Sequence, residues 1–169
     1  MHWLVSDNES GLDWLLYLPG YAVCLLLQNK VLDNRMLVDM QDEQWKRLLE
    51  LARVVLGKGA WASWASDSWC GWTTFSSLEH QLTYWARGVP DAEELLADRT
   101  VDGGLWPQSF YYQDLAHIIF PARFYWEHVV AGVFQSGYKT QDIARLSAEL
   151  HKAAIPHRLT EMVLEVKLY

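Results

Sequence analysis

The final residues of this chain carry a repeating pattern that restricts the fold more than any other feature of the sequence. Apolar side chains occupy every second position from Met162 to Leu168, and charged Glu165 and Lys167 lie between them. A period of two is the period of a β-strand, because successive side chains of a strand point to opposite faces. We therefore expect a strand that ties this end of the chain into a sheet.

Residues 13–39 predict a second group of strands for the same sheet. Apolar, aromatic and β-branched runs at 14–18 and 21–27 flank a Pro-Gly pair, which suits a tight turn. Asp33 and Asn34 mark a further turn before the next apolar run. These features favour an antiparallel meander, so the predicted sheet draws strands from both ends of the chain.

Helical periodicity occurs in several segments between these two groups of strands. The predicted helices cover residues 42–56, 78–86, 90–99 and 140–154. The first and the last of these segments combine apolar residues at helical spacing with residues that suit helix caps. The second helix could instead begin at Cys70. Residues 124–134 favour a strand, whereas 111–120 fit either a helix or a strand.

The size and composition of the chain fit one globular domain. It has 169 residues, of which 51% are apolar and 21% are charged, so it can bury a core without disulfides. No internal repeat, low-complexity tract or linker divides it. We therefore predict a single α+β domain over residues 1–169. Its mixed, mainly antiparallel sheet, with strands from both chain ends, is packed by three or more helices.

The N-terminal residues do not match an export signal. The first charges are acidic, at Asp7 and Glu9, whereas a secretory signal opens with basic residues and an apolar run. The most apolar stretch, 12–27, is interrupted and is too short to cross about 30 Å of hydrocarbon. Two cysteines are too few for a disulfide framework. These observations favour a cytoplasmic protein that has free thiols and no association with a membrane.

Ten tryptophans in this chain exceed ordinary usage several-fold. Four of them lie among Gly, Ala, Ser and Asp without long aliphatic neighbours: Trp61, Trp64, Trp69 and Trp72. Tryptophans are enriched at interaction hot spots, and their large amphipathic rings can also stack on sugars. This segment is therefore a candidate protein interface or carbohydrate platform, with packing inside the fold as the alternative.

The chain is acidic, with 14 Lys and Arg against 21 Asp and Glu and a net charge of −7. This balance argues against direct binding to nucleic acid, which requires a basic surface. Five acids gather in one stretch: Asp91, Glu93, Glu94, Asp98 and Asp102. They could be a solvated face that complements the start of a helix. Alternatively, they form an acidic face that steers a basic protein partner toward the chain.

Cys70 and His128 form a candidate pair for nucleophilic catalysis. A cysteine at the start of a helix gains thiolate character, and a cysteine hydrolase needs a histidine base that is usually distant in sequence. His128 stands at the start of an apolar run. This order and spacing resembles that of papain-like amidases of the cell-wall hydrolase kind, in a chain that meets no family signature. The resemblance implies a thiol hydrolase with Cys70 as nucleophile and His128 as base.

The six histidines do not form a metal-ligand pattern. None belongs to a His-x-x-x-His pair, and the two cysteines are not paired in sequence. Gly57 and Gly59 around Lys58 lack the residues that complete a phosphate-binding loop. We therefore expect neither a metal site nor a cofactor.

An acidic, aromatic-rich domain without a complete catalytic set has the properties of a protein inhibitor. Bacterial immunity proteins, antitoxins and phage-encoded inhibitors share this general character. We therefore expect a small cytosolic domain that occludes a basic partner protein, with residues 61–72 as the anchor and 91–102 for steering. A thiol hydrolase at Cys70 and a carbohydrate- or small-ligand-binding module at 61–72 are the alternatives. The sequence leaves the oligomeric state open.

Overall fold

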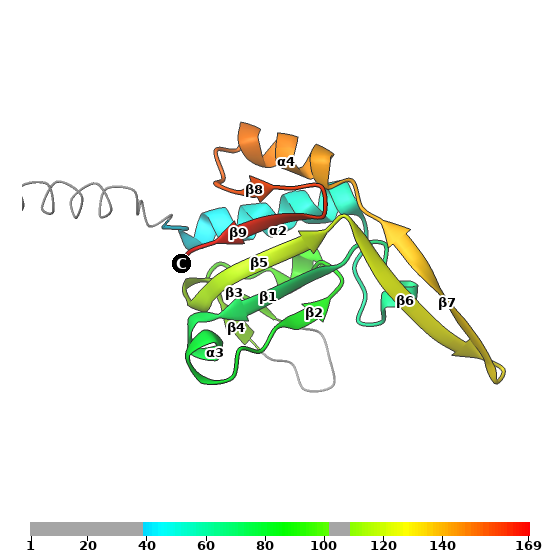
Figure 1. Cartoon of the computed structure of the whole chain (residues 1–169). Coiled ribbons are helices and arrows are strands. Elements are labelled where there is room, and N and C mark those ends of the chain that lie inside the picture. The colour runs from blue at the N-terminus through cyan, green and yellow to red at the C-terminus, as the bar shows by residue number, and fades with distance from the viewer. Residues whose placement is uncertain (1–38, 102–108) are drawn as a thin grey trace, which may run out of the picture. The chain divides into compact units, whose positions relative to one another are not determined.

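The computed structural model describes residues 39–101 and 109–169, and every structural statement below concerns these residues (Figure 1). The predicted N-terminal meander, apart from its last residue, and the predicted steering residue Asp102 lie outside them. The first helix of the described residues is α2 (Asp42–Leu56). It continues through short strands, two further α-helices and several 3-10 turns.

A five-stranded antiparallel sheet forms the centre of the described part, with the strand order β2-β1-β5-β9-β8. Its strands are β1 (Cys70–Thr74), β2 (Trp85–Arg87), β5 (Leu115–Pro121), β8 (Arg158–Leu159) and β9 (Val163–Lys167). Strand β5 is central, and Ile118 on it lies opposite Val166 on β9. The strand predicted from the C-terminal alternation is therefore confirmed.

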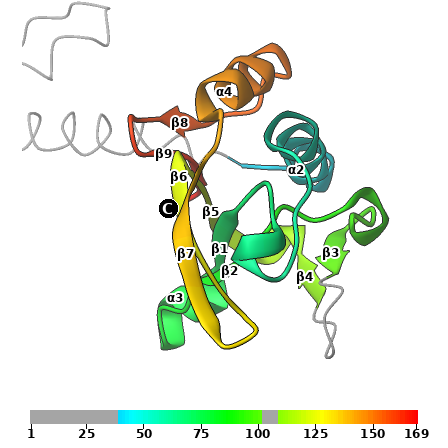
Figure 2. The same cartoon turned by 90° about the vertical axis from the view of Figure 1, so that its right-hand side faces the viewer.

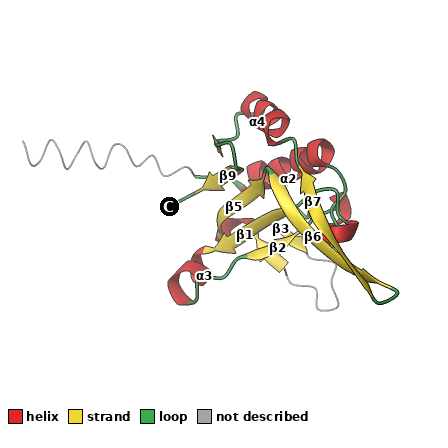
Figure 3. Ribbon diagram, turned by 45° about the vertical axis from the view of Figure 1, so that its right-hand side comes forward, coloured by secondary structure: helices red, strands yellow, loops and turns green. Residues whose placement is uncertain are grey.

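Helices α2 and α4 (Ile143–Lys152) pack against each other and against one face of this sheet (Figure 3). The side chains that α2 buries recur at helical spacing: Trp45, Leu48, Leu49, Ala52 and Leu56. They share one core with Leu146 of α4 and with Phe120 and Val166 of the sheet. The helices predicted at 42–56 and within 140–154 are confirmed, because apolar residues three and four positions apart form one helix face.

Strands β6 (Arg123–Val130) and β7 (Val133–Thr140) form a separate hairpin that extends away from the five-stranded sheet as a long ribbon (Figures 1 and 2). Ala131 and Gly132 make its turn, and both have positive φ angles, of 49° and 81°. The strand predicted at 124–134 is therefore two strands, because the chain reverses at 131–132. A second small antiparallel pair joins β3 (Arg99–Val101) and β4 (Ser109–Tyr111).

The predicted α+β class, with three or more helices packed on a sheet, is wrong, and the described part of the chain is mostly β. It contains three α-helices, of which only α2 and α4 reach seven residues. The third, α3 (Phe75–His80), replaces the helix predicted at 78–86, and its cap is the Thr74 side chain, which accepts a hydrogen bond from the Ser77 amide.

The helix predicted at 90–99 is reduced to the three-residue 3-10 turn η3 (Ala92–Glu94). Neither α3 nor η3 contains a buried residue. Short helices gain most of their stability by burying an apolar face, so segments without one do not extend. The ambiguous segment 111–120 becomes the turn η4 (Tyr112–Asp114) followed by strand β5. The single domain over residues 1–169 stays a prediction.

Candidate functional site

The β6–β7 hairpin has two faces that differ in how much of the chain covers them. Its eight residue pairs run from Arg123 opposite Thr140 to Val130 opposite Val133. Alternate residues of each strand therefore point to opposite faces of the ribbon. One face carries Phe124, Trp126 and His128, and the other carries Tyr125 and Val129.

The segment that contains the clustered tryptophans supports the first face of the hairpin, which we call the braced face. The Trp64 ring, from the 3-10 turn η2 (Ser63–Ala65), stacks on His128 with ring centroids 3.9 Å apart. Trp69 stacks on Phe124 at 5.7 Å. The ammonium group of Lys139 donates hydrogen bonds to the carbonyl oxygens of Trp64, at 2.8 Å, and of Ser66, at 2.7 Å. These contacts hold the ribbon from Phe124 and Lys139 near its base to His128, which lies two residue pairs before the end next to the turn.

The second face of the hairpin, which we call the open face, is exposed and largely apolar. Its apolar residues form two cross-strand pairs, Tyr125 with Tyr138 and Val129 with Phe134, and the polar pair of Glu127 and Ser136 lies between them. The two tyrosine rings meet edge to face at 5.6 Å. Phe134 is 60% exposed and Tyr138 is 62% exposed. Val130 and Val133 are also exposed, but they pair next to the turn on the opposite face of the ribbon.

The chemistry of the open face is that of a contact surface rather than of a reactive site. Tyrosine and phenylalanine supply large, rigid contact areas at little cost in conformational entropy, and aromatic residues dominate binding hot spots. The sequence does not distinguish these residues, because a run of β-formers is equally consistent with a core strand. The weak signal was Gly132 within that run, which marks the reversal between the two strands.

The four predicted tryptophans of the interaction segment divide between surface and core. Trp61 is 50% exposed, and the Arg87 guanidinium lies 4.9 Å from the centre of its ring. Trp64 is also exposed, on the side of its ring that His128 does not cover. Trp69 is partly buried, and Trp72 is only 5% exposed because it belongs to β1 and packs against Phe110.

No protein-family model, curated protein or solved structure gives a significant match to this chain. Within the described residues, no helix combines the length and the apolar character needed to cross a bilayer. The same residues include no cluster of three or more His, Cys, Asp or Glu side chains placed to hold a metal ion.

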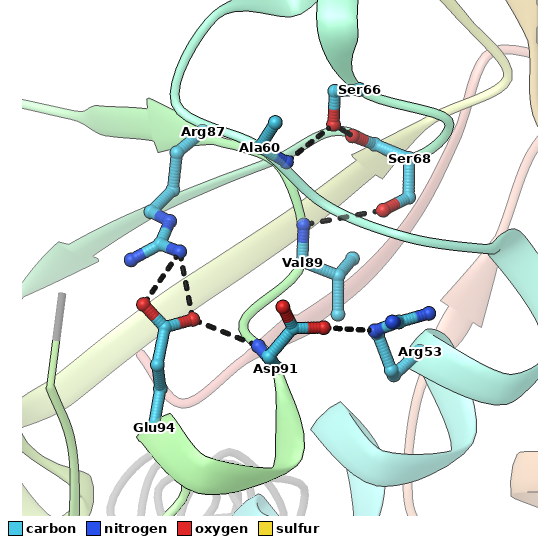
Figure 4. Close-up of polar contacts among 8 residues, drawn as sticks. All are labelled: Arg53, Ala60, Ser66, Ser68, Arg87, Val89, Asp91 and Glu94. Atoms are coloured by element: carbon cyan, nitrogen blue, oxygen red, sulfur yellow. Dashed lines mark hydrogen bonds and ion pairs between the residues drawn. The ribbon is translucent and has the colours of Figure 1, made fainter. Parts of the chain in front are cut away.

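Three of the predicted steering acids, Asp91, Glu94 and Asp98, pair with arginines of the same chain, and Figure 4 shows the pairs of Asp91 and Glu94. Asp91 accepts a hydrogen bond from Arg53 at 2.7 Å. Glu94 accepts two from Arg87, at 3.0 and 2.8 Å, and a third from the Asp91 amide at 2.8 Å. Asp98 pairs with Arg99. Of the predicted acids within the described residues, only Glu93 has no ion pair.

These ion pairs give the acidic stretch a structural role that its sequence does not reveal. The pair Asp91–Arg53 joins the turn η3 to helix α2, and the pair Glu94–Arg87 joins η3 to strand β2. A carboxylate that is paired with a guanidinium contributes little to the long-range field of the molecule. The stretch therefore presents less negative charge to a partner than its sequence indicates.

The expectation that Cys70 opens a helix is wrong, because Cys70 is the first residue of strand β1. Its side chain is fully buried. Burial raises the pKa of the Cys70 thiol to about 12, although the nearby charge of Arg87 opposes this rise. His128 belongs to the hairpin and stacks on Trp64. A buried thiol that keeps its proton is a poor nucleophile, so these positions do not favour the thiol hydrolase.

Proposed function

We propose that this chain is a protein-binding domain whose β6–β7 hairpin makes the main contact with its partner. The observation that carries the proposal is the open face, where Tyr125, Val129, Phe134 and Tyr138 are exposed along one side of the ribbon. Burying apolar surface is worth roughly 25 cal/mol per Å². A group of large exposed apolar side chains bordered by polar residues is typical of an interaction site.

The braced face supports the proposal because it limits the freedom of the hairpin. The two hydrogen bonds from Lys139 near the base and the stacking of Trp64 on His128 near the turn fix the ribbon before any partner binds. A contact surface that is already ordered avoids the entropic cost of ordering on association. The tryptophan-rich segment therefore acts mainly as a support, and the hairpin acts as the anchor.

Charge favours a basic partner. Glu127 lies on the open face, opposite Ser136 and between the two apolar pairs. None of the ion pairs in the described part of the chain includes it. A partner with a lysine or arginine at the centre of the contact would complement this carboxylate, and the net charge of −7 adds to the attraction. The proposed action is occlusion of a basic protein in the cytoplasm.

A capture experiment with matched variants tests the role of the hairpin. The tagged wild-type chain is incubated with lysate of the native host, and bound proteins are eluted with increasing salt. We expect one basic protein in stoichiometric amount. The double variant Tyr125→Ser, Phe134→Ser removes two anchors and is expected to weaken capture at least tenfold, the effect of losing about 1.4 kcal/mol of binding free energy.

The control variant for this experiment is Val54→Ser, which removes an apolar side chain that is 76% exposed on α2, outside the hairpin. It is expected to capture the same protein as the wild type does. Equal capture by the double variant would refute the role of the open face. A wild-type chain that sediments as a dimer, and that the double variant converts to a monomer, would replace the proposal with self-association.

A further inference from the structure

A cluster of charged and polar side chains lies on the five-stranded sheet, on the face opposite to the helices. His117 on β5 lies opposite Lys167 on β9, and Glu165 on β9 lies opposite Arg158 on β8. Ile118 and Val166, which follow His117 and Glu165 in the chain, belong to the core under α2. Because side chains alternate along a strand, the four polar residues share the outer face.

Glu165 is the centre of this cluster. Its side chain is only 8% exposed, and both of its carboxylate oxygens are engaged. One oxygen accepts a hydrogen bond from Arg158 Nε at 2.6 Å, and the other accepts one from His117 Nε2 at 3.0 Å. Burial raises the pKa of Glu165, but the hydrogen bonds from Arg158 and His117 outweigh this effect and lower it below its usual value.

Tyr84 completes a chain of three hydrogen-bonded groups. Its hydroxyl donates to His117 Nδ1 at 2.7 Å, which leaves His117 Nε2–H to donate to Glu165. Burial, with contributions from Tyr169 and Glu165, raises the pKa of Tyr84 to about 12, so the phenol keeps its proton. Burial lowers the pKa of His117 despite its contact with Glu165. The imidazole is therefore neutral at pH 7.

A groove of about 420 Å³ opens beside this cluster. It is lined by Pro156, His157, Arg158, Glu165, Val166, Lys167 and Tyr169. Its volume falls within the range of small-molecule sites, and a cleft with convergent polar groups of shifted pKa is typical of such sites. The groove belongs to β8, β9 and their flanking residues, and none of its lining residues is part of the hairpin.

Cationic side chains outnumber acidic side chains in the groove. The one carboxylate side chain, Glu165, already binds Arg158 and His117, whereas Lys167 has no ion pair with another described residue. The Lys167 ammonium lies 4.2 Å from the centre of the Tyr169 ring. Arg158 uses only Nε and Nη2 on Glu165, and its side chain is 71% exposed. Both cations therefore keep N–H groups that face the groove or solvent.

Stability alone does not account for such a cluster. A buried group of charges seldom stabilises a fold more than apolar side chains of the same volume would. Guanidinium and ammonium groups placed side by side are the usual ligands of carboxylates and phosphates. Arg158 and Lys167 supply N–H donors for an oxyanion, and the Tyr169 ring supplies an apolar wall. The Glu165 carboxylate holds the Arg158 side chain in position.

We propose that the groove beside β8 and β9 binds a small molecule that carries one oxyanion, either a carboxylate or a phosphate, through Arg158 and Lys167. Tyr169 contacts the apolar part of this molecule. His117 holds Glu165, which in turn holds Arg158, and Tyr84 holds the ring of His117. This site is independent of the proposed contact at the hairpin.

The proposal is tested by titrating the ¹⁵N-labelled full chain with phenyl phosphate and, separately, with benzoate, while sodium chloride keeps the ionic strength constant. Saturable shifts are expected at the backbone amides of residues 157–158 and 165–168. Preference for phenyl phosphate assigns the oxyanion as a phosphate, and preference for benzoate assigns it as a carboxylate. Absence of saturable shifts with both probes would overturn the proposal.

Two lysine variants separate a specific site from general attraction to positive charge. Lys167→Gln is expected to weaken binding of the preferred probe at least fivefold, without loss of the fold because Lys167 makes no ion pair among the described residues. Lys152→Gln removes an exposed lysine on α4 and is expected to bind the probe as the wild type does. Equal binding by Lys167→Gln and wild type would overturn the proposal.

Discussion

Gly59 and Gly88 lie where two segments of backbone cross in direct contact. A Cβ atom on Gly88 would lie 2.2 Å from the Ala60 nitrogen, and one on Gly59 would lie 2.0 Å from the Val89 carbonyl oxygen. The Gly88 amide donates a hydrogen bond to the Ala60 carbonyl at 2.9 Å. The Ser66 hydroxyl accepts a hydrogen bond from the Ala60 amide, and the Ser68 hydroxyl accepts one from the Val89 amide (Figure 4). This crossing joins the end of α2 to β2 without space for a side chain.

Gly88→Ala is therefore expected to destabilise the chain by about 3 kcal/mol, because the clash is with backbone that cannot move aside. Gly71→Ala is the matched control, since its Cβ would meet nothing closer than the Trp85 carbonyl oxygen at 3.4 Å. Urea denaturation of both variants measures the difference. If Gly88→Ala unfolds at the same urea concentration as Gly71→Ala, the result would contradict a direct backbone contact between the two segments.

The tryptophans show how far the exposure of single residues in the candidate site can be predicted from sequence. Trp61 and Trp72 have similar neighbours in the chain, yet one is 50% exposed and the other only 5%. The difference arises because Trp72 belongs to a strand that lies between β2 and β5. Such pairing joins residues far apart in sequence, so local composition identifies the segment as unusual but does not predict which of its tryptophans is exposed.

At the scale of elements, the hairpin turn has the conformation that fits a two-residue connection. Positive φ at both Ala131 and Gly132 is the mark of a type I′ turn, whose twist matches that of the flanking strands. Glycine adopts this conformation freely, whereas alanine in the left-handed region costs roughly 1–2 kcal/mol. The turn sequence Ala-Gly therefore differs from the favoured Asn-Gly sequence at its first residue.

Ala131→Asn is expected to stabilise the hairpin by about 1 kcal/mol, because asparagine tolerates the left-handed conformation better than alanine does. Hydrogen exchange of the β6 and β7 amides should slow about fivefold, since local opening controls their exchange. Gly132→Ala, whose Cβ has nothing within 4 Å, should have the opposite effect for conformational reasons alone. Unchanged exchange in both variants would contradict the assignment of the turn.

Elements with a strong period are predictable, and those with weak local signals are not. Helices α2 and α4 and strand β9 follow from apolar residues at a spacing of 3.6 or 2. The hairpin is missed as a unit because its turn contains alanine in place of asparagine. The helix predicted at 90–99 is wrong because Leu95, the one buried residue of 91–99, cannot anchor a longer helix. Leu95 instead pairs with Thr100 in an isolated β-bridge.

At the scale of the whole described part, the helices cover only one face of the five-stranded sheet. Antiparallel sheets tolerate such an arrangement, because one face can contact the core while the other contacts water. The outer face is therefore free to hold His117, Glu165 and Arg158 in a polar cluster. The same arrangement leaves the apolar contact surface on a different element, the hairpin, so the two proposed sites can be altered separately.

The outer face also affects how global stability depends on pH. Burial holds the pKa of His117 below its usual value of 6.5, with Lys167 and Arg158 adding to this effect. Below about pH 6.5 the unfolded chain binds a proton at His117 that the folded chain does not bind. The unfolded state then carries more protons, so the free energy of unfolding falls as the pH falls. Glu165 acts in the same direction, but only below its usual pKa of 4.5.

We therefore expect the free energy of unfolding to decrease between pH 7 and pH 5, with a contribution from His117 of at most about 1.4 kcal/mol per pH unit. His117→Gln should flatten this slope, because glutamine can bond to Tyr84 and Glu165 without titrating. Urea denaturation at several pH values gives the slope of the unfolding free energy against pH for each protein. A loss of stability that is the same at every pH leaves this slope unchanged. An equally steep slope in His117→Gln would show that the acid sensitivity arises elsewhere, and the imidazole would then not be the neutral member of a buried cluster.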